Sequence, residues 1–258
     1  MLRSDIMIKN CLLFLALMLL SGCSDFSHKV VTKRDLGPNH LEKMHLEGPL
    51  TYLGEGSQCI AFTTADEKHV IKFFKQKGNL RHRLLHSVIP VYHRKHARWE
   101  KKLKDSISRY ITAYTYMKEE TALVGIHFKK SDDLSPIMLI DKSGDQHTID
   151  LNAASFVVQK RAKSFTSQWA ESKDSLIEMM LSLLEKRAKL GFHDLTGGYI
   201  FDLNYGFVDN KAVLFDVGRI QFSEVIKDDP KREILKMKTR FYNRLKSAYN
   251  YEIEDERT

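Results

Sequence analysis

Residues 204–218, NYGFVDNKAVLFDVG, carry the most specific local pattern in this chain of 258 residues. Two short apolar runs lie on either side of residues 209–211, DNK, a combination that is typical of two strands joined by a tight turn. Such a hairpin brings its outer ends together, so Asn204 and Asp216 are expected to lie near each other. The DVG segment that begins at Asp216 is also typical of a plain β-turn after a strand, and that alternative stays open.

Upstream of this hairpin, residues 50–75 predict three further strands. Short apolar runs surround the glycine pair Gly54 and Gly56, and residues 68–75, KHVIKFFK, place Lys72 among large apolar side chains. The pattern predicts strand, glycine-rich turn, strand, turn and strand. A lone ammonium among such neighbours is costly to bury unless it is paired. Strand alternation alone leaves open whether Lys72 points to solvent or into the protein.

The remaining segments alternate between helical and strand patterns. Residues 92–120 and 172–190 have apolar positions at intervals of three or four, which predicts two amphipathic helices, and residues 231–249 predict a basic helix. Strand-like runs lie at residues 123–128, 136–140, 147–151 and 154–160. Together these elements predict an α+β fold, in which residues 50–160 are rich in strands and residues 161–258 are mainly helical.

The N-terminal segment has the features of a targeting signal. Its apolar run, residues 11–20, is too short to span a bilayer, since a span needs about 20 helical residues. The run leads into LSGC, which ends at Cys23 and resembles the bacterial lipobox, so residues 1–22 are expected to be cleaved and Cys23 to be acylated. An uncleaved anchor and a buried apolar helix are the alternatives. Residues 23–49 have no sustained apolar period and are expected to form a polar tether.

Charge and cysteine content restrict the class of protein. The net charge of +8 favours anionic partners such as phosphates and lipid head groups. Basic residues cluster at residues 75–109 without the features of a nucleic-acid site, so we interpret the cluster as a solvated helix face and expect no nucleic-acid partner. Of the three cysteines only Cys59 would remain as a free thiol after acylation of Cys23, which excludes a disulfide framework. We expect a membrane-anchored bacterial lipoprotein on the periplasmic or cell-surface face.

The order of the motifs resembles the protein-kinase-like fold over residues 50–220. The stretches that carry the resemblance are YLGEGSQCIAF, HVIKFFK, MKEETALVGIHF and NYGFVDNKAVLFDVGRI, which look like an uncharacterised kinase-like family of chlamydia-related bacteria. The resemblance implies a two-lobed α+β fold with residues 50–160 as the N-lobe and residues 161–258 as a truncated helical C-lobe. It also implies ATP and Mg²⁺ as ligands.

Three residues of the implied N-lobe would bind the nucleotide. Gly54 and Gly56 lack a Cβ, so the loop backbone could approach a triphosphate closely, and Lys72 would bind the α- and β-phosphates. Cys59 stands where the kinase pattern has a third glycine, which leaves the loop motif incomplete.

The kinase pattern also pairs this lysine with a glutamate of the following helix. Glu100 is the first choice for that partner of Lys72, with Asp105 and Glu119 as alternatives. Glu100 fits equally well a surface ion pair with Lys104, which lies one helical turn further on.

In the implied C-lobe, Asp194 would accept or orient the acceptor hydroxyl, and Asn204 and Asp216 would be the Mg²⁺ ligands. Two departures affect the catalytic loop. His193 stands where protein kinases have an arginine. Asn204 follows Asp194 by ten residues, against about five in the kinase pattern, which implies an insertion and makes Asp202 a rival for the catalytic role.

Two functional hypotheses follow from the residues and the resemblance. The first is a phosphotransferase that uses ATP and Mg²⁺ on an unknown protein or small-molecule acceptor. The second is a membrane-tethered pseudokinase that binds a nucleotide or a partner without catalysis. A basic lipoprotein with a structural role is a third, weaker interpretation.

Overall fold

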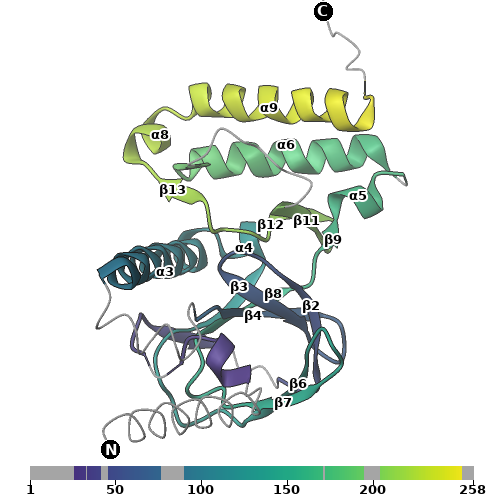
Figure 1. Cartoon of the computed structure of the whole chain (residues 1–258). Helices are drawn as coiled ribbons and strands as arrows, with labels where there is room; N and C mark the ends of the chain where they lie inside the picture. Colours follow the sequence, from purple (N-terminus) through teal and green to yellow (C-terminus); the bar gives the residue numbers. More distant parts are fainter. Residues whose placement is uncertain are drawn as a thin grey trace, which may run out of the picture.

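The computed structural model describes residues 26–32, 34–41, 46–76, 90–170, 172–194 and 204–251 (Figure 1). A large curled sheet of eight strands occupies the lower half of the view, and two long helices, α6 (Lys173–Lys189) and α9 (Lys231–Tyr249), pack side by side in the upper half. The α+β class predicted from the sequence is therefore confirmed.

Three consecutive strands at the centre of the sheet confirm the pattern predicted for residues 50–75. They are β2 (Leu50–Glu55), β3 (Cys59–Thr63) and β4 (His69–Phe74), each antiparallel to the next. Ile71 and Phe73 are completely buried on one face of β4. Because side chains alternate along a strand, Lys72 points from the opposite face, and it is half-buried there.

Five further strands complete the curled sheet. They are β1 (Asn39–Leu41), β5 (Leu123–His127), β6 (Ile137–Ile140), β7 (Gln146–Ile149) and β8 (Phe156–Lys160). The spatial order is β1-β5-β8-β4-β3-β2-β6-β7, and the neighbouring strands are antiparallel except for β2 and β6. The last four of these strands were predicted from the sequence, whereas β1 was not.

The two faces of the sheet pack against separate hydrophobic clusters. One cluster has Phe62, Phe73 and Phe156 at its centre, all without exposed surface. The other contains Val157 of β8, the buried face of helix α3 (Pro90–Tyr116) and the helical half of the protein. Each fully buried phenylalanine contributes about 1.5–3 kcal/mol to folding relative to an exposed one. The second cluster joins the sheet to the helical half.

The segment predicted as a polar tether belongs to the fold from Phe26 onward. Phe26 lies in the 3-10 helix η1 (Phe26–Lys29) and packs edge-on against Phe62, with 5.5 Å between the ring centroids. Val31 is completely buried, and its amide donates a 2.8 Å hydrogen bond to the Phe74 carbonyl. The tether prediction is therefore corrected for the described part of residues 23–49. The prediction failed because the segment has too few apolar residues to produce a detectable period, although Phe26 and Val31 are buried.

Helix α3 covers one face of the sheet. It packs through Trp99, Leu103 and Ile107, which lie four positions apart and are all buried. The helix predicted for residues 92–120 is interrupted at Met117, after which the short helix α4 (Lys118–Thr121) begins. The left-handed conformation of Ala122, with φ of 53°, then turns the chain into β5.

The helical half also contains two small sheets. One has the spatial order β12-β11-β9, formed by β9 (Lys163–Ser164), β11 (Tyr205–Val208) and β12 (Lys211–Leu214). The other pairs β10 (Phe192–Asp194) with β13 (Ile220–Phe222). The remaining helices of the described residues are α5 (Phe165–Gln168) and α8 (Glu224–Asp228). The predicted hairpin of β11 and β12 and the predicted helices α6 and α9 are confirmed. Within the described ranges, every helix is too short or too polar to cross a membrane.

Candidate functional site

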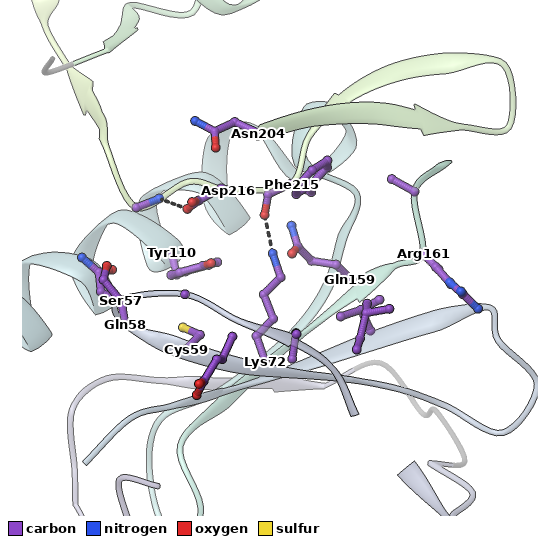
Figure 2. A pocket seen from close by; sticks show the side chains of 18 of the residues that line it. Ser57, Gln58, Cys59, Lys72, Tyr110, Gln159, Arg161, Asn204, Phe215 and Asp216 are labelled. Carbon is purple, nitrogen blue, oxygen red and sulfur yellow. Dashed lines mark hydrogen bonds between the residues drawn. The ribbon is translucent and has the colours of Figure 1, made fainter. Parts of the chain in front are cut away.

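A cavity of about 900 Å³ opens between the curled sheet and the hairpin of β11 and β12 (Figure 2). Five residues that the sequence singles out line it together: Gly54, Gly56, Lys72, Asn204 and Asp216. The volume is within the range of cavities that bind cofactors and small molecules, about 300–1,000 Å³. Residues separated by more than a hundred positions in the sequence therefore meet at one cavity.

Lys72 reaches across the cavity from β4 to the segment that follows β12. Its Nζ donates a 2.5 Å hydrogen bond to the carbonyl of Phe215 and lies 5.6 Å from the centroid of the Phe215 ring. Figure 2 shows this side chain between Cys59 and Gln159, with Asp216 and Asn204 on the far side. The alternative in which Lys72 points to solvent is thus excluded.

Burial lowers the pKa of the Lys72 ammonium below its usual value, and the nearby Asp216 carboxylate opposes the shift. The hydrogen bond to a carbonyl supplies only a neutral partner, so the ammonium keeps most of its capacity to pair with an anion. An anionic group that enters the cavity would find a desolvated cation there.

Asn204 and Asp216 lie at the same end of the hairpin, as the sequence predicts. The amides of Phe215 and Asp216 both donate to the Asn204 carbonyl, at 2.9 and 3.4 Å. The Gly218 amide donates a 3.0 Å hydrogen bond to Oδ1 of Asp216, which closes a tight turn. The plain-turn alternative is correct as a description of the backbone, but the turn also faces the cavity.

Asn204 and Asp216 offer two oxygen ligands to a metal ion. Among the residues that the structure describes, no group of three or more His, Cys, Asp and Glu side chains is placed to hold a metal. Mg²⁺ in nucleotide sites is commonly held by one or two protein oxygens together with phosphate oxygens and water. The pair fits an ion that arrives with a phosphate ligand better than it fits a resident metal.

The loop between β2 and β3 borders the same cavity. A Cβ added at Gly54 or at Gly56 would meet no atom within 4 Å, so packing within the chain does not require glycine at either position. The Gly56 amide donates a 2.9 Å hydrogen bond to the Cys59 carbonyl and so closes the loop. Burial raises the pKa of the Cys59 thiol to about 12, which keeps the thiol protonated and unreactive.

Glu100 does not have the role that the resemblance implies. Its carboxylate accepts a 2.7 Å hydrogen bond from Arg34, and it forms this ion pair on the part of α3 that lies away from the cavity. Glu100 precedes Ser106, the first residue of α3 with a side-chain contact to the loop, by six residues, or roughly 9 Å along the helix axis. The Lys72–Glu100 pair is therefore corrected, because the packing of the helix against the sheet sets its axial position.

The alternative acidic partners are also placed elsewhere. Asp105 is exposed on α3, and Glu119 lies 3.8 Å from Lys186 of α6. The connections of α3 to the site are made by residues that the sequence reasoning missed. Arg109 donates a 2.6 Å hydrogen bond to the Gly218 carbonyl, and the Ser106 hydroxyl donates to the side-chain carbonyl of Gln58.

Gln159 of β8 is a further residue that the sequence reasoning missed. It is 1% exposed and lines the cavity, directly opposite Val70 in the register of β4 and β8. Its Nε2 donates a 2.8 Å hydrogen bond to the Thr121 carbonyl, which fixes the orientation of the amide. Its Oε1 has no hydrogen-bond partner among the described residues. A buried acceptor of this kind is costly unless a donor is supplied.

Asp194 is outside the lining of the cavity. It ends β10, and its Oδ1 lies 3.3 Å from Nη2 of Arg187, a residue of α6 that has no exposed surface. Arg187 also contacts the Tyr205 hydroxyl at the start of β11. The carboxylate of Asp194 thus lies against a buried cation, which is a structural contact, and its catalytic role stays a prediction. Asp202 and Cys23 lie outside the described residues.

Replacing Asp194 by alanine is therefore expected to lower the free energy of unfolding by about 3 kcal/mol, because the buried Arg187 would lose the carboxylate oxygen that lies 3.3 Å from its Nη2. Urea denaturation followed by circular dichroism measures the change. Asp132→Ala, which removes an exposed loop carboxylate, is the matched control and should change stability by less than about 0.5 kcal/mol. An Asp194→Ala protein as stable as the parent would contradict the structural role.

The chain matches no protein-family model and no curated protein sequence. Among the side chains that line the cavity, Lys72, Asn204 and Asp216 have chemistry suited to an anionic ligand and its counter-ion.

Proposed function

We propose that the chain is a kinase-like phosphotransferase that binds ATP and Mg²⁺ in the cavity between the curled sheet and the β11–β12 hairpin. The observation that carries the proposal is the meeting of Lys72, Asn204 and Asp216 at one cavity under the glycine-rich loop. These are the cation, the two oxygen ligands and the thin loop that phosphoryl transfer needs. The acceptor is unknown and could be a protein or a small molecule.

The order of the strands supports a two-lobed kinase-like arrangement. The glycine-rich loop joins β2 to β3, and Lys72 lies on β4, the third strand of the antiparallel series. Helix α3 follows β4, and the chain returns through β5 and β8 to the other side of β4. In the kinase pattern the phosphate-binding lysine likewise stands on the third strand, before the helix. The hairpin of β11 and β12 then supplies the metal ligands from the other half.

The cavity has a phosphate end and an apolar end. Leu53, Ala61 and Val70 provide apolar surface from three neighbouring strands, which suits a flat base. Gln159 lies beside that surface and offers an acceptor oxygen for an N–H group of such a ring. Lys72 and Asp216 lie toward the glycine-rich loop, where the phosphates and Mg²⁺ would be held. A bound Mg²⁺ would neutralise charge on the phosphates.

The chain's own residues would bind and orient the nucleotide as follows. Lys72 would exchange its hydrogen bond to the Phe215 carbonyl for one to a phosphate oxygen, which gains a charged partner for a desolvated ammonium. Asn204 and Asp216 would hold the metal against the same phosphates. Gly54 and Gly56 leave room for the loop backbone to approach them.

A specific observation favours the alternative of a pseudokinase. Asp194, the residue expected to orient the acceptor, is paired with Arg187 and lies outside the lining of the cavity. A chain with this arrangement would be a membrane-tethered module that binds a nucleotide or a partner without transfer.

Phosphoryl transfer separates the two functions. The full-length chain, solubilised in detergent, is incubated with ATP labelled at the γ-phosphate and Mg²⁺, and the label is followed into the protein, added proteins and small hydroxyl compounds. Transfer or ATP turnover that disappears in Asp216→Asn supports the phosphotransferase. Binding of ATP without loss of its γ-phosphate supports the pseudokinase. A failure to bind ATP contradicts the phosphotransferase and the nucleotide-binding form of the pseudokinase.

We further propose that acylation of Cys23 anchors the chain to a bacterial membrane, on the periplasmic or cell-surface face. Cys23→Ser is expected to move the protein from the membrane fraction to the soluble fraction and to abolish labelling by a clickable palmitate analogue. Cys59→Ser, which removes a half-buried thiol of the folded domain, is the matched control and should stay in the membrane fraction. Membrane association that survives Cys23→Ser would contradict the anchor.

A further inference from the structure

Helix α3 contacts both walls of the cavity through residues one turn apart. On the metal side, Nη1 of Arg109 donates a 2.6 Å hydrogen bond to the Gly218 carbonyl. On the loop side, Ser106 donates to the side-chain oxygen of Gln58, and the backbone carbonyl of Gln58 accepts a 2.8 Å hydrogen bond from the amide of Lys75, which directly follows β4. Residues three positions apart lie on the same side of a helix, so one face of α3 makes both contacts.

The two contacts meet at Gly218. Its amide donates to Asp216 and its carbonyl accepts from Arg109, so the residue is held on both sides. A Cβ at this position would lie 3.1 Å from Oδ1 of Asp216 and 3.2 Å from Oε1 of Gln58. A side chain here would have to displace these two oxygens by a few tenths of an ångström, so the loop, the turn and the helix approach one another closely at this point.

We propose that Arg109 and Ser106 are positioning residues, through which α3 holds the Asp216 turn and the glycine-rich loop at a set distance. They would do so in place of a lysine–glutamate pair, since Glu100 is bound to Arg34 and Lys72 to the Phe215 carbonyl. The inference rests on the proposed binding of ATP and Mg²⁺. It adds that the helix acts on the site through the metal ligand and the loop and not through the lysine.

The packing of α3 against the sheet allows it to hold the Asp216 turn and the glycine-rich loop in position. The helix is anchored to the sheet by its buried face, and Tyr110, next to Arg109, packs edge-on against Phe74 of β4 with 5.5 Å between ring centroids. Tyr110 also lines the cavity. A displacement of α3 would therefore move the Gly218 carbonyl and Gln58 together, and with them the Asp216 carboxylate.

The direction in which Mg²⁺ affinity changes when Arg109 is replaced distinguishes a positioning role from a purely electrostatic one. Arg109 is a cation near the proposed metal site, so loss of its charge alone would strengthen Mg²⁺ binding. Loss of its hydrogen bond would leave the Asp216 turn unsupported and weaken Mg²⁺ binding. The two roles predict opposite changes for the same substitution.

The test is the affinity of the full-length chain for ATP, measured by titration calorimetry with and without Mg²⁺. Arg109→Ala is expected to reduce the Mg²⁺-dependent gain in ATP affinity at least about 10-fold, and Arg109→Lys to restore part of it, because an ammonium can donate to the same carbonyl. Arg98→Ala, an exposed arginine on the same helix, is the matched control and should behave as the parent. Thermal unfolding of each variant verifies that the fold is intact.

Ser106→Ala tests the loop contact separately. It is expected to weaken ATP binding about 3- to 10-fold even without Mg²⁺, whereas Ser108→Ala, at an exposed position two residues away, should not. Parent-like Mg²⁺ dependence in Arg109→Ala, or stronger Mg²⁺ binding, would overturn the positioning role of Arg109. Parent-like ATP affinity in Ser106→Ala would overturn that of Ser106. If the parent itself does not bind ATP, the proposed function fails, and this inference fails with it.

Discussion

Replacing Lys72 by methionine is expected to weaken ATP binding by about 10- to 100-fold. The ammonium is the desolvated cation of the cavity, and a hydrogen bond to a charged partner contributes about 1.5–3 kcal/mol, which corresponds to this range. Methionine keeps most of the length of the side chain and its contact with the Phe215 ring, so the cavity should keep its shape. Titration calorimetry of the full-length chain with ATP measures the loss.

Lys68→Met is the matched control for this substitution. Lys68 is exposed in the turn before β4, four residues from Lys72, and carries the same charge. It should leave ATP affinity within about twofold of the parent, because exposed charges are screened at physiological salt. Equal affinities for the parent and Lys72→Met would show that Lys72 is a structural cation bound to the Phe215 carbonyl and not a phosphate ligand.

Replacing Asp216 by asparagine is expected to remove the Mg²⁺-dependent part of ATP binding, a loss of about 10- to 100-fold when Mg²⁺ is saturating. Asparagine has the same shape and retains an oxygen for the hydrogen bond from the Gly218 amide, so the turn should persist. It lacks the negative charge that a hard divalent cation requires. Affinity for ATP measured in EDTA should be unchanged or higher, since a carboxylate that repels phosphate has been removed.

Asp209→Asn, in the turn of the same hairpin, is the control for that experiment. Asp209 is exposed and forms an ion pair with Lys160 that contributes little to stability. Its substitution should leave the affinity for ATP unchanged from the parent, both with Mg²⁺ and in EDTA. If Asp216→Asn retains the full Mg²⁺ effect, the metal is held elsewhere and the assignment of Asn204 and Asp216 is wrong.

Elements with a strong local pattern could be predicted from the sequence. The glycine-rich turn between β2 and β3 and the hairpin of β11 and β12 are specified by residues next to one another, so their strands were located within a few residues. Helices α3, α6 and α9 follow from the recurrence of apolar side chains on one face. Short elements such as β1, β9 and β13 have too few residues for any period, and only tertiary pairing creates them.

Candidate site residues could likewise be predicted only where a local pattern specifies their position. Lys72 could be assigned to its strand from the local pattern, although alternation left its direction open until the structure showed it, and the hairpin predicted that Asn204 and Asp216 lie close together. The partner of Glu100 could not be predicted, because it depends on the position at which α3 packs along the sheet. At that position Glu100 pairs with Arg34 from the N-terminal segment. Arg109 and Gln159 gave no signal, since an arginine on an amphipathic helix and a glutamine in a strand are unremarkable until packing brings them to the cavity.

The central claim is that the cavity between the curled sheet and the β11–β12 hairpin binds ATP together with Mg²⁺. Titration calorimetry of the full-length chain in detergent, with ATP in the presence of Mg²⁺ and then in EDTA, tests it most directly. We predict saturable binding of one ATP per chain that Mg²⁺ tightens at least about 10-fold, through the ligands Asn204 and Asp216. Absence of any saturable heat up to millimolar ATP, with the fold intact by circular dichroism, would contradict the account.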